Sequence, residues 1–451
     1  MKNIVLIGLP GCGKTTLGER LTEKLGRRLV DLDEEIEKSA GMPITEIFAR
    51  YGEPHFRDIE SNIIQQLESE KGLIISTGGG AVLRAENVAS LKRNGFIIFL
   101  DRPVRDICTD VKIAHRPLLK SGAGAVGELA QKRLPIYESA ADAVVAVKGE
   151  IDTVLLELLM IAAALNTSGY TVIGDPIGHS LSPLLHKTVF EAQKIEEEYT
   201  AIHVPRGKLE GFMAAVRASG IKGFNATIPH KQDIISLLDK VDSEAMLCGA
   251  VNTVVCQNGI MRGYNTDMEG LSLALEQAGH GFKNRNILLI GAGGAARAVA
   301  LKAGLEKAKS LYIAARSTEK AGELAAHVEK ATGLAATFGG NSADALENAC
   351  KKSDLLINAT PLGMKGIAEN HESFLFLEAL PKHSLVCDLI YNPLETTLLK
   401  RARELGIDTL NGLGMLVFQA LIAQELFLGK GLEKTKLFKA AIQRLEREFI
   451  V

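Results

Sequence analysis

The sequence of 451 residues lacks several features that would assign it to a common class of binding protein. Its 52 Lys and Arg residues balance 54 Asp and Glu residues, so no excess of positive charge indicates nucleic acid or an anionic membrane as a partner. It has no tryptophan, and its six cysteines include no Cys-x-x-Cys pair that would indicate zinc. We therefore expect reduced, mostly buried thiols, and small anionic ligands bound by local clusters of cations.

Long apolar runs are also missing. The longest helical one, residues 154–165, contains Glu157 and is shorter than the roughly 20 residues needed to cross a bilayer. Met1-Lys2 leads directly into an expected strand, which leaves no room for a signal peptide. No low-complexity segment and no internal repeat interrupts the chain. We expect a cytoplasmic protein that acts on small molecules and binds neither nucleic acid nor a membrane.

Short β-branched runs alternate with helical patterns along the chain, which is typical of α/β proteins with parallel sheets. The length suggests about three domains. The clearest boundary is Asn166-Thr167-Ser168-Gly169, which follows a predicted helix at 151–165, and a softer boundary lies near 279–286. Strands are expected at 3–7, 73–76, 96–100, 143–147, 170–173, 287–290, 310–314, 355–358 and 385–389.

Two different glycine-rich loops each follow an apolar, strand-like run. Residues 8–15 have the Walker A spacing, in which backbone N–H groups surround phosphates, the Lys reaches the outer phosphates and the Thr hydroxyl helps to hold Mg²⁺. Residues 291–296 have the Gly-x-Gly-x-x-Ala spacing of a dinucleotide-binding fold. The chain is thus predicted to hold two nucleotide sites. The expected contacts are Gly11, Cys12, Gly13, Lys14, Thr15 and Thr16 for ATP, and Gly291, Ala292, Gly293, Gly294 and Ala295 for the dinucleotide.

The strand after the second loop indicates which dinucleotide binds. An NAD-preferring site usually places Asp or Glu at the end of this strand, where it binds the ribose 2′-hydroxyl. Here the strand is followed by Ala315-Arg316-Ser317, with Lys320 one helical turn further on. Arg316 and Lys320 favour NADP(H), because they could bind its 2′-phosphate. Thr360 and Met415 are expected to complete the contacts with this cofactor.

Further motifs in the first third indicate the reaction that the Walker A loop serves. Asp31-Leu32-Asp33 follows a short strand, Phe56-Arg57 and Glu60 share a helix, and Gly78-Gly79-Gly80 ends another strand. Arg116-Pro117 and Arg133 come later in the chain. In this order, over about the first 165 residues, the motifs closely resemble shikimate kinase.

The resemblance to shikimate kinase implies a role for each of these residues. Asp31 would order Mg²⁺ together with Thr15, and Asp33 would bind the acceptor hydroxyl and act as the base. The substrate carboxylate would be held by Arg57, which Glu60 positions, and by Arg133. The substrate ring would lie against Gly78, Gly79 and Gly80, while Lys14 and Arg116, the latter on a lid, would neutralise the phosphoryl group.

One segment departs from the kinase pattern. Family members often carry an Arg shortly before the lid that stacks on adenine, whereas this chain has Cys108-Thr109-Asp110 there and Arg105 slightly earlier. The adenine contacts therefore stay open. A non-catalytic, nucleotide-binding regulatory module is the alternative for this third of the chain.

The other two thirds resemble shikimate dehydrogenase, over about residues 169–451. The motifs are Ser180-Leu181-Ser182-Pro183, Asn225-Ala226-Thr227-Ile228-Pro229-His230-Lys231, Asn252-Thr253, Asn265-Thr266-Asp267, Asn358-Ala359-Thr360-Pro361, Tyr391-Asn392-Pro393 and Gly414-Met415-Leu416-Val417-Phe418-Gln419. Met268 and Ala226 depart from common family residues, and neither removes a polar group with an expected role.

The resemblance to shikimate dehydrogenase implies that Lys231 and Asp267 are the catalytic pair, with Lys231 either donating a proton to the developing alkoxide or stabilising it. Ser180 and Ser182 would bind the substrate carboxylate, with Tyr391 nearby. Ring hydroxyls would be bound by Thr227, Asn252 and Gln419.

The two resemblances share one metabolite. We expect a bifunctional enzyme that reduces 3-dehydroshikimate to shikimate with NADPH and phosphorylates shikimate with MgATP. A kinase domain would span 1–165, and a substrate-binding domain would span 169–280, completed by 412–451. A Rossmann NADP domain would span 281–411, with the dehydrogenase site between it and the substrate domain. Quinate and NAD stay an alternative for the dehydrogenase half, although Arg316 argues against NAD.

Overall fold

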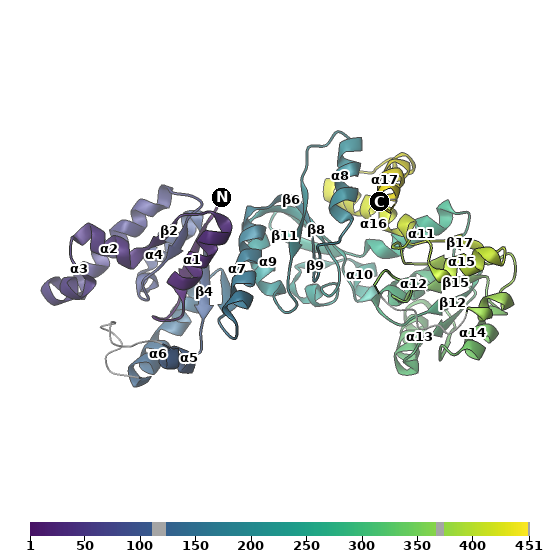
Figure 1. The fold of residues 1–451 in the computed structure, drawn as a ribbon, viewed down its shortest axis with the longest axis horizontal. Coiled ribbons are helices and arrows are strands. Elements are labelled where there is room, and N and C mark those ends of the chain that lie inside the picture. The colour runs from purple at the N-terminus through teal and green to yellow at the C-terminus, as the bar shows by residue number, and fades with distance from the viewer. Residues whose placement is uncertain (111–122, 367–373, 450–451) are drawn as a thin grey trace. The chain divides into compact units, whose positions relative to one another are not determined.

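The computed structural model describes residues 1–110, 123–366 and 374–449. The chain divides into two compact units (Figure 1). The first consists of Met1–Ser168, Gly174–Pro176 and Ile202–Ile221, and the second of Gly169–Ile173, Ile177–Ala201 and Lys222–Val451. The predicted domain limits differ from this division, because Gly174–Pro176 and Ile202–Ile221 belong to the first unit. The predicted limits stay predictions.

The first unit is built on a parallel sheet of five strands in the order β2-β3-β1-β4-β5. Its central strand β1 is apolar except for one residue and is buried along its whole length, as expected for a parallel strand with helices on both faces. The elements are β1 (Asn3–Ile7), α1 (Lys14–Leu25), β2 (Leu29–Asp31), α2 (Leu32–Ala40), α3 (Ile44–Gln66), β3 (Ile74–Ser76), α4 (Ala85–Asn94), β4 (Gly95–Asp101), α5 (Val104–Asp110), α6 (Ala123–Ala140), β5 (Ala143–Ala146) and α7 (Ile151–Asn166).

Helix α9 (Leu209–Ala218) also belongs to the first unit. It packs on α7, and Lys208, which precedes α9, forms an ion pair with Glu157 of α7. Glu157 is buried, so Lys208 supplies the charge that a buried carboxylate needs. The apolar character of α7 thus reflects burial within this unit.

A six-stranded sheet has the order β7-β6-β8-β10-β11-β9. It is mixed, because β10 runs antiparallel to both β8 and β11. The antiparallel pair forms because Asn258-Gly259, both with positive φ, makes the tight turn of a β10–β11 hairpin. The elements are β6 (Ser168–Gly174), α8 (Ser182–Ala192), β7 (Tyr199–His203), β8 (Gly220–Ala226), β9 (Lys240–Val241), α10 (Ser243–Cys248), β10 (Thr253–Gln257), β11 (Ile260–Tyr264) and α11 (Thr266–Gln277).

The third sheet is parallel, in the order β14-β13-β12-β15-β16-β17, which is the strand order of a Rossmann fold. One apolar core joins its strands to α10 and α11, since Cys248 and Met268 pack with Leu289. The elements are β12 (Asn286–Ile290), α12 (Gly294–Leu305), β13 (Ser310–Ala314), α13 (Thr318–Thr332), β14 (Ala336–Gly339), α14 (Ala343–Cys350), β15 (Leu355–Asn358), β16 (Leu385–Asp388), α15 (Thr397–Glu404) and β17 (Asp408–Leu410).

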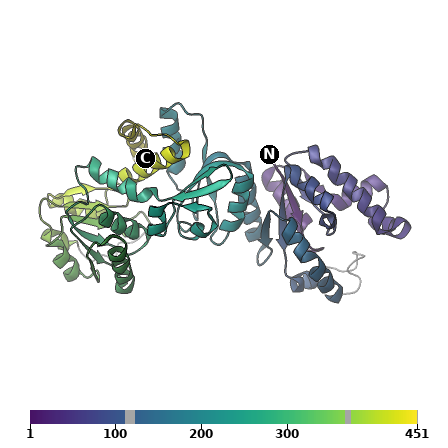
Figure 2. The same ribbon diagram turned by 180° about the vertical axis from the view of Figure 1, so that it is seen from behind.

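The C-terminal helices α16 (Leu413–Leu428) and α17 (Lys434–Phe449) return to α8 (Figure 1 and Figure 2). Helix α16 also packs tightly on α11. A side chain at Gly270 of α11 would meet the backbone N of Gln419 at 2.8 Å, so glycine allows this close approach. The last segment of the chain therefore places Gln419 beside α11.

All six cysteines lie in the described residues as thiols, as expected, and four of them are buried. No group of three or more His, Cys, Asp and Glu side chains in the described ranges is arranged to hold a metal ion. Within the same ranges, no helix combines the length and apolarity needed to span a membrane.

Candidate active sites

The Walker A loop of the first unit follows β1 and leads into α1. Three of its glycines, Gly8, Gly11 and Gly13, have φ values of 146°, 87° and 102°, which other residues rarely adopt. Lys14 is buried, and its Nζ donates to the carbonyls of Gly8 and Leu9 over 2.9 and 3.0 Å. The loop thus surrounds an ammonium group at the N-terminus of a helix, an arrangement that suits phosphate.

Three side-chain oxygens lie together beside the loop. The Thr15 hydroxyl donates to Oδ2 of Asp31 over 2.8 Å and lies 3.2 Å from the Ser76 hydroxyl. The other Asp31 oxygen accepts from the backbone N–H of Asp33 and caps α2, which fixes the carboxylate. Such oxygens are the ligands that Mg²⁺ prefers in phosphate sites, so Thr15 and Asp31 fit the expected ion. Ser76 was missed, although it ends β3 at the same sheet edge.

Arg57 on α3 is held by two carboxylates. Its Nη1 donates to Glu60 over 2.7 Å and its Nη2 to Glu53 over 3.0 Å. Burial alone would lower the pKa of Arg57, but the carboxylates of Glu60 and Glu53 outweigh it and raise that pKa. Burial raises the pKa of Glu60, and the charge of Arg57 opposes it. The Glu60 contact was expected, whereas Glu53 was missed despite its i,i+4 spacing from Arg57.

The three consecutive glycines make room for this arginine and its neighbours. A side chain at Gly80 would collide with the Arg57 guanidinium, and one at Gly79 would meet the Pro10 ring at 2.9 Å. A side chain at Gly78 would meet the carboxylate of Asp33 at 2.9 Å. The carbonyl of Gly79 accepts from Nη1 of Arg133 over 2.9 Å and from the Tyr137 hydroxyl.

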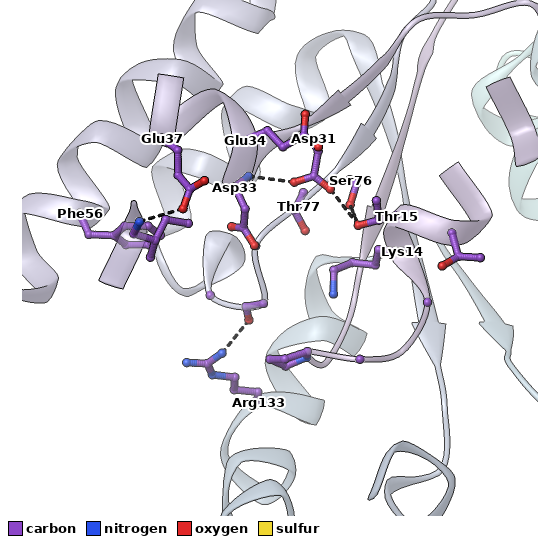
Figure 3. Close-up of a pocket in the computed structure, with 18 of the residues that line it drawn as sticks. Lys14, Thr15, Asp31, Asp33, Glu34, Glu37, Phe56, Ser76, Thr77 and Arg133 are labelled. Atoms are coloured by element: carbon purple, nitrogen blue, oxygen red, sulfur yellow. Dashed lines mark hydrogen bonds between the residues drawn. The ribbon is translucent and has the colours of Figure 1, made fainter. Parts of the chain in front are cut away.

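These groups surround one cavity of about 630 Å³ (Figure 3). Most of the predicted kinase residues line it, but the Cys12 side chain is buried behind the loop and Arg116 lies outside the described residues. The predicted residues that line the cavity are Gly11, Gly13, Lys14, Thr15, Thr16, Asp31, Asp33, Arg57, Gly78, Gly79, Gly80 and Arg133. Those that sequence reasoning missed include Glu34, Glu37, Phe48, Ser76, Thr77 and Arg102.

In the second unit, Lys231 and Asp267 form the expected pair. The Lys231 Nζ donates to Oδ2 of Asp267 over 2.6 Å, and Nδ2 of Asn252 donates to Oδ1 over 2.8 Å. The amide of Asn252 is fixed in turn, because its Oδ1 accepts from the backbone N–H of Thr266 over 2.8 Å. The side chain of Asn265 caps α11 by accepting from the backbone N–H groups of Asp267 and Met268, so the start of this helix positions Asp267.

A buried polar chain continues behind this pair. Asn225 donates to the carbonyl of Asn252 over 3.0 Å and to the hydroxyl of Thr253 over 2.9 Å. Asn225 accepts from the Tyr199 hydroxyl over 2.6 Å, and burial raises the pKa of Tyr199 well above its usual value. Tyr199 was not singled out, and Asn225 was quoted only as the first residue of a motif with no role of its own, because their partners lie on strands far apart in the sequence.

The other predicted substrate contacts lie on several elements of the second unit. Ser180 accepts from the backbone N–H of Ser182 at the start of α8, and Thr227 directly follows β8. Tyr391 lies close enough to Lys231 for its pKa to be affected, although burial dominates and raises it. The amide of Gln419 donates to the carbonyl of Leu416 within α16. Contact of these side chains with a substrate stays a prediction.

The second glycine loop lies where β12 ends, opposite the end of β15. Gly291 has a φ of 117°, and a side chain there would meet the Thr360 methyl at 3.1 Å. The Thr360 hydroxyl donates to Asn358 over 2.7 Å, and the Asn358 amide donates to the buried Asp388 over 3.0 Å. The loop is therefore fixed at the topological switch point, where a Rossmann sheet binds its ligand.

Arg316 and Lys320 are exposed beyond the end of β13. Ser317 caps α13 by accepting from the backbone N–H of Lys320, while Ala315 is buried. Met415 is partly buried against the Rossmann core. Two exposed cations beside a glycine loop fit a dinucleotide with an additional phosphate.

The two sites define two classes of enzyme in one chain. The first is a P-loop phosphotransferase, since a Walker A loop and a Thr15–Asp31 cluster share a cavity with fixed arginines. The second is a dinucleotide-dependent oxidoreductase, since a Rossmann loop accompanies a Lys–Asp pair.

Known families match both parts. The family model "Shikimate kinase" matches residues 10–162, and the models "Shikimate dehydrogenase substrate binding domain" and "Shikimate / quinate 5-dehydrogenase" match 172–254 and 272–386. A shikimate dehydrogenase (NADP(+)) of Symbiobacterium thermophilum is 41% identical over 276 residues, or 61% of this chain and 94% of that protein.

Two crystal structures are also similar. A shikimate dehydrogenase in complex with NADP+ has 38% identity and a TM-score of 0.56, covering 62% of this chain and 96% of its own. The enzyme of Thermus thermophilus in complex with NADP(H) and shikimate has 32% identity and a TM-score of 0.54, covering 62% and 100%.

The chain therefore belongs to the shikimate dehydrogenase family and carries a shikimate kinase domain on its N-terminal side. It is a bifunctional shikimate-pathway enzyme with kinase and NADP-dependent oxidoreductase activities, and its cofactors are NADP(H) and, with ATP, Mg²⁺.

Proposed function

We propose that the chain reduces 3-dehydroshikimate to shikimate with NADPH and then converts shikimate to shikimate 3-phosphate with MgATP. The Lys231–Asp267 pair, held by Asn252, is the observation that supports the first reaction. The cavity that joins Asp33, Arg57 and Arg133 to the Walker A loop supports the second. The product of the first reaction would be the substrate of the second.

In the reduction, Lys231 would donate a proton to the keto oxygen of the substrate. Asp267 accepts a hydrogen bond from Lys231 and so holds the ammonium group at a fixed position. The carboxylate of the substrate would be bound by Ser180 and Ser182, and its hydroxyls by Thr227, Asn252 and Gln419. NADPH, when bound by the second glycine loop, Arg316 and Lys320, supplies the hydride ion.

In the phosphorylation, Asp33 would accept the proton of the attacking hydroxyl. Arg57 and Arg133 would hold the substrate carboxylate at the other side of the ring. Thr15 and Asp31 would hold Mg²⁺, and Lys14 would neutralise charge on the phosphoryl group that ATP supplies. Such a reaction depends mainly on positioning and charge neutralisation, which this set of groups provides.

A domain assignment accompanies the proposal. Residues 1–165 would form the kinase, 169–280 with 412–451 the substrate-binding domain, and 281–411 the NADP domain. Three separate sheets support this division.

The test is a coupled assay of the full chain with 3-dehydroshikimate, NADPH and MgATP, in which NADPH loss and ADP formation are followed separately. Lys14→Ala should abolish ADP formation and leave NADPH oxidation intact. Lys231→Ala should lower NADPH oxidation by about 10²-fold or more and leave ADP formation from added shikimate intact. An intact chain that oxidises NADPH but forms no ADP with added shikimate would contradict the proposed phosphorylation.

Specificity is tested by supplying shikimate or quinate with NADP+ or NAD+ in the reverse direction. We expect the highest kcat/KM with shikimate and NADP+. A higher value with quinate and NAD+ would favour the quinate alternative.

A further inference from the structure

Arg102 is a cation of the kinase cavity to which the reaction above gives no role. It directly follows β4 and lines the cavity together with Gly11, Gly13 and Lys14. Its Nη1 donates to the carbonyl of Gly11 over 3.2 Å. Arg102 therefore lies against the Walker A loop, and its side chain is partly buried there.

The topology of the sheet places Arg102 where nucleotides bind. Strands β1 and β4 are parallel neighbours, but the chain leaves β1 toward β2 on one side and leaves β4 toward β5 on the other. The point between β1 and β4 is thus the topological switch point, where α/β sheets bind ligands outside the carboxyl ends of their strands. The Walker A loop follows one of these two strands, and Arg102 follows the other.

The other cations that line the described part of the cavity have separate tasks. Arg57 is held by two carboxylates, and Arg133 donates to the glycine run beside Asp33. Lys14 is the other cation at the loop itself. A triphosphate carries several negative charges, and a planar guanidinium binds phosphate oxygens through pairs of N–H groups.

We propose that Arg102 is a nucleotide-binding residue whose guanidinium binds the polyphosphate of ATP. The Gly11 carbonyl accepts from its Nη1 and orients the guanidinium at the loop, where bound phosphate oxygens would lie. This role deepens the proposed kinase function and rests on it. Arg102 thereby supplies a contact in a chain whose segment Cys108-Thr109-Asp110 holds no arginine.

The experiment compares Arg102→Met, which keeps the length of the side chain without its charge, with Arg102→Lys in the full chain. Arg93→Met is the matched control, because Arg93 on α4 is 67% exposed beside Glu68 and does not line the cavity. ADP formation is measured while ATP and shikimate are varied in turn. Tripolyphosphate, which has the phosphates without base and sugar, is the competing probe.

Arg102→Met should raise the KM for ATP about tenfold or more and raise the inhibition constant of tripolyphosphate by a similar factor, with partial recovery in Arg102→Lys. The KM for shikimate, NADPH oxidation and all constants of Arg93→Met should stay unchanged. An unchanged KM for ATP, or a rise confined to shikimate, would overturn the proposal.

A raised KM for ATP with unchanged tripolyphosphate inhibition would also overturn it, since the contact would then be to base or sugar. The Lys14→Ala chain distinguishes a failure of the proposed kinase function from a failure of the role proposed for Arg102. If Lys14→Ala abolishes ADP formation while Arg102→Met leaves the KM for ATP unchanged, the kinase function stands and the role of Arg102 fails.

Discussion

The two glycine-rich loops of this chain differ in the backbone conformation of the glycines that are expected to bind phosphate. In the first loop Gly8, Gly11 and Gly13 all have positive φ, and the loop surrounds a buried lysine. In the second loop Gly291 has a positive φ, whereas Gly293, with φ −88°, has no neighbouring atom within 4 Å of the position of a side chain. The backbone conformation requires the three glycines of the first loop and Gly291 of the second, whereas Gly293 leaves space for a ligand.

The source of positive charge differs in the same way. The first loop contains its own cation, Lys14, inside the fold. The second loop has none, and its cations are the exposed Arg316 and Lys320 beyond the next strand. The cation of the first loop is therefore fixed inside the fold, whereas the cations near the second loop are exposed to solvent.

Substitution of one glycine in each loop gives the largest expected contrast. Gly8→Ala should abolish ADP formation and lower the free energy of unfolding of the first unit by at least about 2 kcal/mol, because φ is 146° and the new methyl would lie 2.9 Å from the Leu100 carbonyl. Gly293→Ala should leave unfolding unchanged and raise the KM for NADPH about tenfold, since the pyrophosphate approaches this backbone. Calorimetry and steady-state kinetics measure both effects.

Either of two results would break this contrast. One is a Gly8→Ala chain with normal kinase activity. The other is a Gly293→Ala chain that unfolds at a lower temperature than the unsubstituted chain.

Arg316→Ala sharpens the contrast in charge. Loss of charge-assisted hydrogen bonds to the 2′-phosphate should raise the KM for NADPH about 10- to 100-fold and leave the KM for NADH nearly unchanged. Initial rates with both cofactors give the ratio. Lys320→Ala serves as the comparison, with a smaller change expected. An equal rise for NADPH and NADH would show that Arg316 does not distinguish the two cofactors.

Lowering the pH should change the stability of the two units in opposite directions. This effect should be smaller than those of the substitutions above. Burial lowers the pKa of His186 to about 3 from 6.5, so the stability that neutral His186 contributes is present above pH 6.5 and is lost as pH falls toward 3. Burial raises the pKa of Glu60, so the stability that protonated Glu60 contributes to the first unit is present at low pH and is lost as pH rises. When the pH falls from 6.5 to 5, the proton linkage of His186 alone should lower the free energy of unfolding of the second unit by about 2 kcal/mol.

Urea unfolding at pH 7.5 and 5 measures this difference. His186→Gln should remove most of the His186 contribution, whereas His383→Gln, at an exposed position, should not. Equal pH dependence in the His186→Gln chain and the unsubstituted chain would contradict the assignment.

Local sequence signals predicted most strands and both loops. The run at 3–7 is apolar and followed by glycines, and it forms β1 over the same residues. The β10–β11 hairpin carried a local signal as well, the pair Asn258-Gly259, but neither of its strands was among those predicted. Such features depend on neighbours in the chain, so the sequence reveals them directly.

Features made by distant residues could not be predicted in this way. Tyr199 and Asn225 meet because β7, β6 and β8 lie side by side in one sheet, and no local pattern pairs the two residues. The packing of α9 on α7 likewise depends on tertiary contacts. The Lys231–Asp267 pair was predicted only through its resemblance to a known family, and the structure brings the two groups to 2.6 Å.

The hydrogen bonds around Asn252 have a direction that the backbone sets. The peptide N–H of Thr266 can only donate, so it fixes the carbonyl end of the Asn252 amide, and the NH₂ end then faces Asp267. One oxygen of Asp267 accepts from this NH₂ group, and the other accepts from Lys231. A single peptide bond at the start of α11 thus orients, through one amide, the carboxylate that holds Lys231.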